Sequence, residues 1–575
     1  MRLLRVTTLE LKNSLTKQTV EDGIEQYKRD RDPRETLFEF GRCVVHFAVD
    51  DAKVAMCTAL KGTKGMAKES WFLPFDQGWN DGAGNPPNLD GLKTDYLWKR
   101  ILTPAGLTDI LENYAQVVEE ENPSTGKKKP VQIFPRYHQL ALVRMLLGDV
   151  RAKGAGQRYL IQHSAGSGKS NSIAWLAHQL ISARKDGKEV FDSIIVVTDR
   201  RPLDKQIRET IKGFAQVGSI IGAVKEGAGV SKTEQLAKFL TDGKKIIICT
   251  VQTFPFVLDS IGAEHRGGNF AIIIDEAHSS QGGRTAAISA ALGEAAEEEE
   301  ETTEDKINRI IWQRKMLPNA SYFAFTATPK NKTLEMFGIV YSESGEVKHR
   351  PFHGYTMKQA IQEGFFLDVL KNYTPVDSYY RLAKTVEGDP EFDVKKACKK
   401  LRLYVESHSK AIRDKAEIMV DHFLEQVIGQ NKIGGQARAM VVTGNIQRAL
   451  QYFCAFRDYL TELKSPYQAI VAFSGEPEFK GEKVSEAKLN GFPGNDIADK
   501  IQEDPYRFLI CADKFQTGYD EPLLHTMYVD KALSGIKAVQ TLSRLNRAHP
   551  KKDKVFVLDF QNDTEIIEKS FADYY

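Results

Sequence analysis

The chain has 575 residues, of which 42% are hydrophobic and 27% are charged, and its formal net charge is +2. At about 150 residues per domain, this length predicts three or four domains that each bury a core. A net charge this close to zero excludes attraction of a polyanion by the whole molecule, so any contact with nucleic acid must use a local basic groove.

The spacing of the cysteines and the lengths of the apolar segments exclude further classes of protein. The six cysteines lie far apart without a CxxC pair, which argues against a zinc site and a disulfide scaffold and fits a reducing compartment. The first residues, MRLLRVTTLELK, lack the apolar core of a signal peptide, and no run approaches the roughly 18 apolar residues of a membrane span. We therefore expect a cytoplasmic protein.

The first patterned stretch is VTTLELKNSL, residues 6–15. Its apolar–polar alternation predicts a strand that carries Glu10 and Lys12 on the same face. This pair suits a metal-dependent nuclease, in which the carboxylate holds Mg²⁺ and the ammonium steadies the attacking water. The same spelling recurs elsewhere, as in Glu346–Lys348, so the pair alone does not identify a nuclease. A polar, lysine-rich stretch at 119–130 is expected to be a linker.

Two series of uninterrupted apolar runs follow, and each alternates with helical stretches. The first series comprises RYLIQH, SIIVVTD, KIIICT, FAIIIDE and SYFAFTAT, and the second comprises RAMVVTGN, YQAIVAFS, YRFLICAD, HTMYVDKA and KVFVLDF. Strands of this kind between helices predict parallel sheets that are covered on both faces. We expect an α/β protein with two tandem sheet domains, residues 131–340 and 341–575, preceded by a mixed region, residues 1–130. The acidic run at 293–305 is expected to be a solvated loop or a frayed helix.

The stretch LIQHSAGSGKSNS, residues 160–172, predicts a strand, a glycine-rich turn and the start of a helix. Its glycines let backbone N–H groups close around phosphate oxygens, while Lys169 reaches the β- and γ-phosphates and Ser170 ligates Mg²⁺. His163 stands where the pattern G-x-x-x-x-G-K-[ST] has its first glycine. The candidate residues for binding ATP are Ser164, Ala165, Gly166, Ser167, Gly168, Lys169 and Ser170.

The stretch FAIIIDEAH, residues 270–278, places two acids at the carboxyl end of a buried strand, where α/β proteins bind ligands. Asp275 is expected to hold Mg²⁺ through water, and Glu276 to orient and deprotonate the attacking water. The alternative is an aspartate that merely caps the strand, but a free carboxylate is costly to bury there.

The order of these motifs resembles that of superfamily 2 helicases and translocases. DEAH, which ends at His278, and FTATP (325–329) resemble motifs II and III, whereas FQTGYDEP (515–522) and QTLSRLNR (540–547) resemble motifs V and VI. The resemblance implies two RecA-like domains that hold ATP between them. The residues that would couple closure to DNA are His278, Thr326 and Thr328.

The same resemblance assigns roles around the nucleotide. Gln139 in RYHQ would read adenine, and Asp520 and Gln540 would sense the nucleotide from the second domain. Arg544 and Arg547 would lie on one helix face and reach the γ-phosphate as arginine fingers. A solvated basic helix turn is the alternative for these arginines.

Stretches that look like motifs Ia and Ib, and their counterpart in the second domain, offer polar side chains to DNA phosphates. These residues are Arg200, Arg201, Thr250, Gln252, Thr443 and Arg448. Such contacts would position a duplex without reading its sequence.

The N-terminal stretch and the spelling of the motor motifs resemble the restriction (R, HsdR-type) subunit of type I restriction enzymes. DRRPLDKQ, TVQTF and DKFQTGYDEPLLHTMYVDK are close to that family's versions of the motifs. The resemblance implies an ATP hydrolase and type I site-specific deoxyribonuclease that translocates along double-stranded DNA and cleaves it away from the recognition site. Its partners would be the methyltransferase and specificity subunits of a restriction-modification complex.

Within a partial PD-(D/E)xK nuclease region, Glu10 would match the metal-binding glutamate, Lys12 the catalytic lysine, and Gln26 the start of the family's Gln-x-x-x-Tyr helix. Position 30 is Asp instead of Tyr, and none of the nine residues before Glu10 is the aspartate that such a site needs. We therefore expect a truncated chain that keeps the motor and loses efficient cutting. The alternatives are a stand-alone superfamily 2 DNA or RNA helicase and a nucleotide-gated module that holds DNA without turnover.

Overall fold

A computed structural model describes most of the chain. The described residues are 6–62, 66–121, 128–164, 166–198, 221–223, 232–251, 253–263, 267–275, 311, 317–343, 345–376, 409–516, 519 and 521–572. The contacts divide the chain into two units, and the division falls between Phe365 and Phe366. The expected domain limits at residues 130 and 340 stay a proposal.

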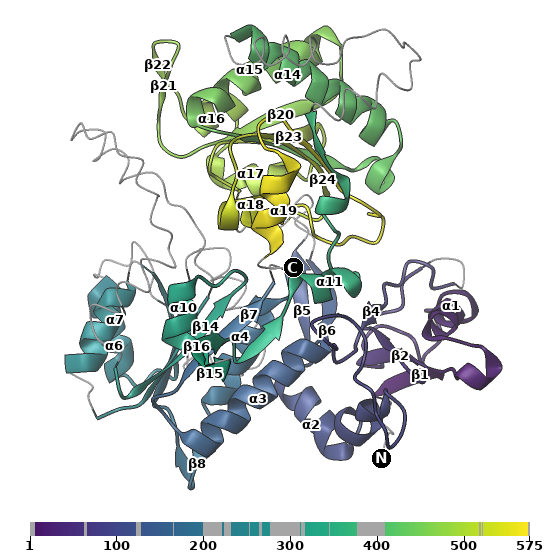
Figure 1. Cartoon of the computed structure of the whole chain (residues 1–575), viewed down its shortest axis with the longest axis vertical. Helices are drawn as coiled ribbons and strands as arrows, with labels where there is room; N and C mark the ends of the chain where they lie inside the picture. The colour runs from purple at the N-terminus through teal and green to yellow at the C-terminus, as the bar shows by residue number, and fades with distance from the viewer. Residues whose placement is uncertain are drawn as a thin grey trace. The chain divides into compact units, whose positions relative to one another are not determined.

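The N-terminal part of the first unit is a four-stranded sheet in the order β1-β2-β3-β4. Its strands are β1 (Thr7–Leu11), β2 (Val45–Val49), β3 (Val54–Cys57) and β4 (Leu73–Pro74). Helix α1 (Val20–Asp30) connects the parallel pair β1–β2, and it begins at a capping box between Thr19 and Asp22. Figure 1 shows α1 beside these strands. Short helical turns, Ser14–Thr16 and Leu97–Ile101, and helix α2 (Pro104–Asn113) complete this part.

The expected linker at 119–130 is wrong, because strands occupy both of its described ends. Strands β5 (Gln116–Glu121) and β6 (Lys128–Ile133) pair as an antiparallel hairpin. The buried amide of Gln132 donates hydrogen bonds to carbonyl oxygens of Cys43, Val44 and Thr58, which ties the hairpin to the N-terminal sheet. The glutamates and lysines of these two strands concealed the alternation of Val131 and Ile133.

The larger sheet of the first unit has seven parallel strands in the order β11-β12-β10-β13-β14-β7-β17. They are β7 (Arg158–His163), β10 (Ser193–Thr198), β11 (Ile221–Ala223), β12 (Ile246–Thr250), β13 (Phe270–Ile274), β14 (Ala320–Thr326) and β17 (His353–Tyr355). The surrounding helices are α3 (Tyr137–Lys153), α4 (Lys169–Leu180), α6 (Lys232–Thr241), α7 (Phe254–Ala263), α10 (Asn331–Phe337) and α11 (Met357–Gln362).

Both faces of this sheet are buried, as the apolar strand sequences predict. Ile194 and Val196 of β10 join a core with α3, α4 and the N-terminal sheet, whereas Ile195 and Val197 join a core with α7 and α10. Successive side chains of a strand point to opposite faces, so an unbroken apolar run fills two cores at once. The N-terminal sheet and the seven-stranded sheet consequently share one continuous core.

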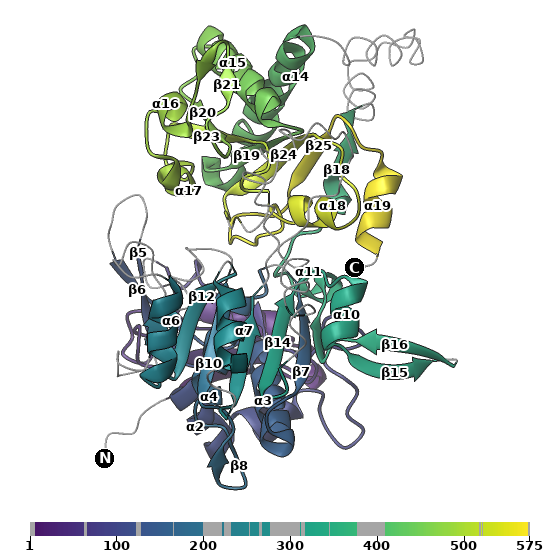
Figure 2. The same cartoon turned by 90° about the vertical axis from the view of Figure 1, so that its left-hand side faces the viewer.

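Two small hairpins extend from the first unit. One pairs β8 (Arg184–Lys185) with β9 (Lys188–Glu189), and the other pairs β15 (Ile339–Glu343) with β16 (Glu346–Arg350). Figure 2 shows the β15–β16 hairpin projecting away from the sheet.

The second unit is built on six parallel strands in the order β18-β25-β24-β19-β23-β20. They are β18 (Tyr373–Pro375), β19 (Arg438–Thr443), β20 (Gln468–Ala472), β23 (Tyr506–Cys511), β24 (Leu524–Asp530) and β25 (Phe556–Asp559). Its helices are α14 (Ser409–His422), α15 (Ile446–Glu462), α16 (Glu486–Asn490), α17 (Ile497–Lys500), α18 (Gly535–Leu542) and α19 (Thr564–Ala572). A π-helical turn (Phe423–Ile428), 3-10 turns (Leu370–Asn372, Lys432–Gly435, Gly494–Asp496) and the hairpin β21 (Glu478–Phe479)–β22 (Glu482–Lys483) connect them.

All ten strands predicted from the two apolar series are present, and the two parallel sheets confirm the expected α/β fold class. Among the described residues, no helix is long and apolar enough to cross a bilayer. The five cysteines in the same residues are free thiols.

Candidate functional site

The glycine-rich turn joins the carboxyl end of β7 to the first turn of α4. Gly166 and Gly168 have φ angles of 80° and 82°, a left-handed conformation that glycine adopts without strain. A Cβ atom at Gly168 would also collide with the amide nitrogen of Gln139. The N-terminus of α4 is therefore available to an anion at this turn. Ala165 lies outside the described residues.

Lys169 lies over the start of this loop. Its Nζ donates hydrogen bonds to the carbonyl oxygens of His163 and Ser164, at 3.0 and 3.3 Å. The ammonium is thus held where it can reach the phosphates that such a loop binds. Ser170 follows on the first turn of α4 and is partly exposed.

Two further motifs end at the same edge of the sheet. Asp275 directly follows β13, is 3% exposed, and donates its N–H to the carbonyl of Val197 at 3.0 Å. Thr326 ends β14, which lies between β13 and β7, and its Oγ1 accepts the N–H of Thr328 at 3.3 Å. Because the three strands are parallel neighbours, their carboxyl ends bring Asp275 and Thr326 to the edge that carries the phosphate loop. Glu276 and His278 lie outside the described residues.

The oxygen atoms at this edge fit a magnesium ion that is bound together with a nucleotide. Mg²⁺ prefers oxygen ligands, commonly one or two carboxylates plus substrate phosphates. The hydroxyl of Ser170 and the carboxylate of Asp275 are donors of this kind. No group of three or more His, Cys, Asp or Glu that could hold a metal occurs in the described part of the chain, so such an ion would rely on the phosphates.

Gln139 contacts the phosphate loop directly. Its Oε1 accepts the N–H of Arg136 at 3.0 Å, its Nε2 donates to the carbonyl of Gly168 at 2.9 Å, and the side chain is 3% exposed. Both ends of the amide are therefore engaged with backbone atoms. A role for Gln139 in reading adenine stays a proposal.

Sequence reasoning did not single out the aromatic groups that pack around this loop. His138 Nε2 lies 3.1 Å from the carbonyl oxygen of Ser167, and its ring stacks on Tyr355 with centroids 3.7 Å apart. His163 Nε2 lies 2.9 Å from Nδ1 of His353. Burial lowers the pKa of His138 and His163 well below the ordinary value and that of His353 to about 4. The only signal in the sequence was that RYHQ and FHGY each place an imidazole near a tyrosine.

The expectation that Arg544 and Arg547 share a helix face is wrong, because α18 ends at Leu542. Arg544 lies in the turns that follow, where its Nε donates to the carbonyl of Gln540 at 3.0 Å and its Nη1 to that of Tyr519 at 3.1 Å. Gln540 itself is on α18 and is 8% exposed, whereas Asp520 lies outside the described residues.

A long-range backbone contact explains the early end of this helix. Arg547 forms an isolated antiparallel bridge with Phe366, and the N–H of Leu367 donates to the carbonyl of Asn546 at 3.1 Å. The guanidinium carbon of Arg547 lies 5.9 Å from the centroid of the Phe366 ring. The backbone therefore pairs across the second unit instead of continuing the helix.

The residues expected to contact DNA differ in how accessible they are. Thr250 ends β12, and its Oγ1 lies 3.3 Å from that of Thr253. Thr443 is fully buried and donates its hydroxyl to the carbonyl oxygens of Cys511 and Asn445, so this hydroxyl does not reach the surface. Arg200, Arg201 and Gln252 lie outside the described residues.

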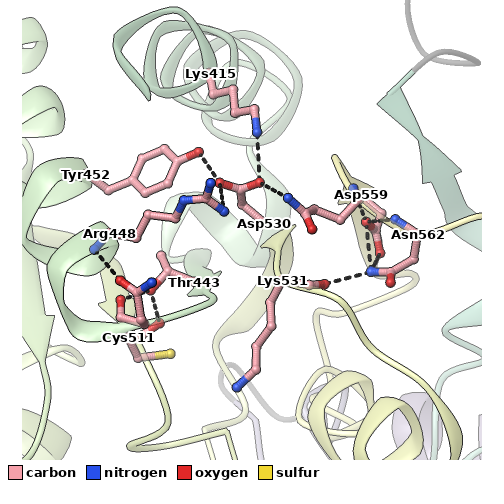
Figure 3. A network of polar contacts seen from close by, with 11 residues as sticks. Lys415, Thr443, Arg448, Tyr452, Cys511, Asp530, Lys531, Asp559 and Asn562 are labelled. Atoms are coloured by element: carbon pink, nitrogen blue, oxygen red, sulfur yellow. Dashed lines mark hydrogen bonds and ion pairs between the residues drawn. The ribbon is translucent and has the colours of Figure 1, made fainter. Parts of the chain in front are cut away.

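Arg448 is the accessible member of this group in the second unit. Its side chain is 40% exposed, and Nη1 lies 3.8 Å from Oδ2 of the buried Asp530. Asp530 also accepts hydrogen bonds from Lys415 and Tyr452, both at 2.8 Å (Figure 3). The guanidinium is thus held at the carboxyl end of β24 and still reaches solvent.

Glu10 and Lys12 do not lie in a cluster of three or more metal-ligating side chains within the described residues. Lys12 Nζ donates to Oε1 of Gln26, so α1 closes over the strand as the family pattern implies. The side chain of Glu10 is 14% exposed and is ion-paired with Arg31. Since the described residues hold no group of three metal-ligating side chains, a metal ion does not fit Glu10 as it stands here.

The phosphate loop beside Asp275 and Thr326, at one edge of a parallel sheet, defines an ATPase of the helicase type in the first unit. Sequence comparisons agree with this class. Residues 138–396 match the family described as SWI2/SNF2 ATPase, and residues 481–562 match type I restriction enzyme subunit R domain 3. The chain is therefore related to the R subunits of type I restriction enzymes, as its motifs predict.

Curated relatives are described as endonuclease subunits of type I restriction enzymes. The HindI endonuclease subunit of Haemophilus influenzae is 23% identical over 482 residues, which cover 78% of this chain and 41% of that protein. The SauMRSORF196P endonuclease subunit of Staphylococcus aureus is 22% identical over 515 residues, which cover 83% and 48%. The chain spans less than half the length of these type I restriction enzyme subunits.

Solved structures with a similar course of the chain were also found. A fragment assigned to the HsdR subunit of a type I restriction enzyme from Vibrio vulnificus is 16% identical with a TM-score of 0.47, and covers 96% of this chain and 80% of that one. The Type ISP restriction-modification enzyme LlaBIII bound to DNA is 14% identical with a TM-score of 0.47, and covers 80% and 30%.

Proposed function

We propose that this chain is the ATP-driven double-stranded DNA translocase of a type I restriction endonuclease R subunit. The observation that carries the proposal is the shared edge of β13, β14 and β7, where Asp275, Thr326 and the phosphate loop meet inside the region that matches a SWI2/SNF2 ATPase. The related curated proteins are endonuclease subunits, which supports the restriction system as the setting.

In the proposed reaction, water attacks the γ-phosphorus of ATP while the bond to the β-phosphate oxygen breaks. Lys169 and the N–H groups at the start of α4 would hold the β- and γ-phosphates, and Glu276 would orient the water and accept its proton. Mg²⁺, held by Ser170 and Asp275, would neutralise charge on the phosphates. Arg544 and Arg547 would stabilise the charge that develops on the transferred phosphoryl oxygens, and Asp520 and Gln540 would sense the nucleotide.

The proposed track is double-stranded DNA, and the proposed partners are the methyltransferase and specificity subunits of a cytoplasmic complex. Since phosphate contacts carry no sequence information, recognition of a target would have to come from those partners. Efficient cutting by this chain alone is not part of the proposal, because Glu10 is paired with Arg31 instead of with a metal.

The test combines four assays of the full chain. We expect linear duplex DNA to stimulate ATP hydrolysis, and Lys169→Ala and Glu276→Gln each to abolish that stimulation. A translocase should displace a triplex-forming strand from the duplex without separating the duplex strands. Separation of the duplex strands would favour a stand-alone helicase. DNA binding that responds to nucleotide without any turnover would favour a nucleotide-gated binding module.

A further inference from the structure

His138 stands between two parts of the candidate ATP site and has no role in the motif assignments. It precedes Gln139 on α3, it is 6% exposed, and its Nε2 lies 3.1 Å from the carbonyl oxygen of Ser167. A carbonyl oxygen only accepts hydrogen bonds, so Nε2 must carry the proton and donate it. Because burial lowers the pKa of His138 well below its ordinary value, the ring is neutral at physiological pH.

The contact has a geometric consequence for the phosphate loop. A trans peptide is planar, and its C=O and N–H point to opposite sides. When His138 holds the carbonyl of Ser167 toward α3, the N–H of Gly168 must point away from α3. Gln139 donates to the same Ser167 carbonyl at 3.4 Å and to the carbonyl of Gly168 at 2.9 Å. With the N–H of Asn171, which also bonds the Gly168 carbonyl, it supports the orientation of the Lys169 N–H. Adjacent residues of α3 thus orient adjacent amides of the loop.

Tyr355 holds His138 in this position. The two rings are stacked at 3.7 Å and 14°, and the carbonyl of Tyr355 accepts the N–H of Ser164 at 3.0 Å. The Tyr355 hydroxyl donates to Oε2 of Glu363 at 2.7 Å, and Gln359 donates to the other oxygen of Glu363 at 2.8 Å. One tyrosine therefore fixes both the start of the loop and the imidazole that holds its end.

His163 completes this support. It stands where the phosphate-loop pattern has its first glycine, it is fully buried, and it is hydrogen-bonded to His353 of the neighbouring strand β17. A side chain that is packed and bonded in this way restricts the backbone where a glycine would leave it free.

We propose that His138 is a positioning residue for nucleotide binding: its Nε2–H, held by stacking on Tyr355, orients the Gly168 amide toward the phosphates of ATP. This inference rests on the proposed function for the identity of the ligand. In this inference the hydrogen bond of His138 orients the amide, and the stacking on Tyr355 keeps the imidazole in place.

Two variants separate the hydrogen bond from the packing. His138→Phe keeps an aromatic ring against Tyr355 and removes the donor, whereas His138→Gln keeps a donor of similar reach and removes the ring. We expect His138→Phe to raise the KM for ATP and the Kd of a fluorescent ATP analogue about tenfold, the size expected when the Gly168 N–H loses its hydrogen bond to a charged phosphate. His138→Gln should recover most of the affinity. His349→Phe on the exposed hairpin strand β16 is the matched control and should leave both constants unchanged.

Direct binding of the analogue keeps this test distinct from that of the motor. If the wild-type chain binds the analogue but does not hydrolyse ATP, the proposed motor fails while the binding constants of the variants still decide the role of His138. The inference is overturned if His138→Phe binds as the wild type does, or if His138→Gln is the weaker of the two variants. Should His138→Phe fail to fold, as its thermal melt would reveal, His138→Gln decides: near-wild-type affinity supports the hydrogen bond, and a tenfold loss contradicts it.

Discussion

The carboxylate of Glu10 accepts a hydrogen bond from Nε of Arg31 at 2.9 Å, and the same oxygen is bonded to Nη2 of that guanidinium. Arg31 directly follows the last residue of α1, so the helix that brings Gln26 onto Lys12 also delivers a cation to Glu10. The hydrogen bond to Glu10 raises the pKa of Arg31. The acid that the family pattern assigns to a metal is thus neutralised by its own chain.

Because of this pairing, we expect the chain with ATP and Mg²⁺ to leave a supercoiled plasmid intact. The measurement is the yield of nicked and linear DNA on a gel, with Lys12→Ala as the matched control. Linear product made by the wild-type chain and lost in Lys12→Ala would contradict the expectation, since it would show that Glu10 and Lys12 support cutting in spite of Arg31.

The buried ion pair of Lys415 and Asp530 gives a prediction for the stability of the second unit. Their side chains are 5% and 1% exposed and lie 2.8 Å apart. Asp530→Asn leaves the ammonium without its anion in the core, so we expect the unit to lose about 3–5 kcal/mol. All five tryptophans precede residue 366, so hydrogen exchange of peptides from β24 is the suitable measurement.

The control for this prediction is Glu482→Gln, which breaks an ion pair with Lys488 in which both side chains are more than half exposed. Exposed pairs contribute little to stability, so exchange of β24 should hardly change in this variant. Equal effects of the two substitutions would show that the buried pair has no special role.

The strands could be predicted from the sequence, whereas contacts between distant segments could not. Each core strand is an apolar run whose side chains fill both faces of a sheet. This pattern can be read from a few neighbouring residues. The end of α18 is not visible in the sequence, because QTLSRLNR has the composition of a continuing helix, whereas Arg547 forms a bridge with Phe366. The pairing of β5 with β6 was missed for a related reason, since the glutamates and lysines of these two strands look like a linker.

The candidate site shows the same division. The glycines and Lys169 identify the phosphate loop in one short stretch. The groups that hold it come from α3, where His138 lies 29 residues before Ser167, and from β17, where His353 lies 190 residues after His163. The expected phosphate contact of Thr443 is an example. A threonine at the end of a strand suits such a contact, but this hydroxyl donates to the carbonyl of Cys511 instead. Sequence patterns name the residues that meet a ligand more readily than those that hold them in place.

Glu363 gives a prediction for the pH dependence of the first unit. Burial raises its pKa to about 7 from an ordinary value of 4.5. The folded state therefore keeps a proton that the unfolded chain releases between these two pH values, and the free energy of unfolding falls as the pH rises through this range. The contribution is complete below pH 4.5 and is lost by about pH 7, and it amounts to about 3 kcal/mol.

Glu363→Gln removes this titration, so we expect its stability to fall less than that of the wild type between pH 4.5 and 7. Tryptophan fluorescence during urea unfolding reports on the first unit, and the wild-type minus variant difference cancels titrating groups that do not interact with Glu363. Glu346→Gln on the exposed hairpin strand β16 controls for the loss of one charge. A difference that does not change with pH would contradict the prediction.

Arg448 and Thr443 give opposite predictions for DNA binding by the second unit. The Arg448 side chain is 40% exposed, so Arg448→Ala should weaken binding to duplexes of any sequence and reduce the slope of log K against log salt concentration by about 1. Thr443→Val should leave the slope unchanged, because its hydroxyl is buried in hydrogen bonds to carbonyl groups. Arg457→Ala is the matched control, since Arg457 lies on the same helix and is 61% exposed. If Arg457→Ala changes the slope as much as Arg448→Ala, the effect comes from the general charge of α15 and not from a phosphate contact at its first turn.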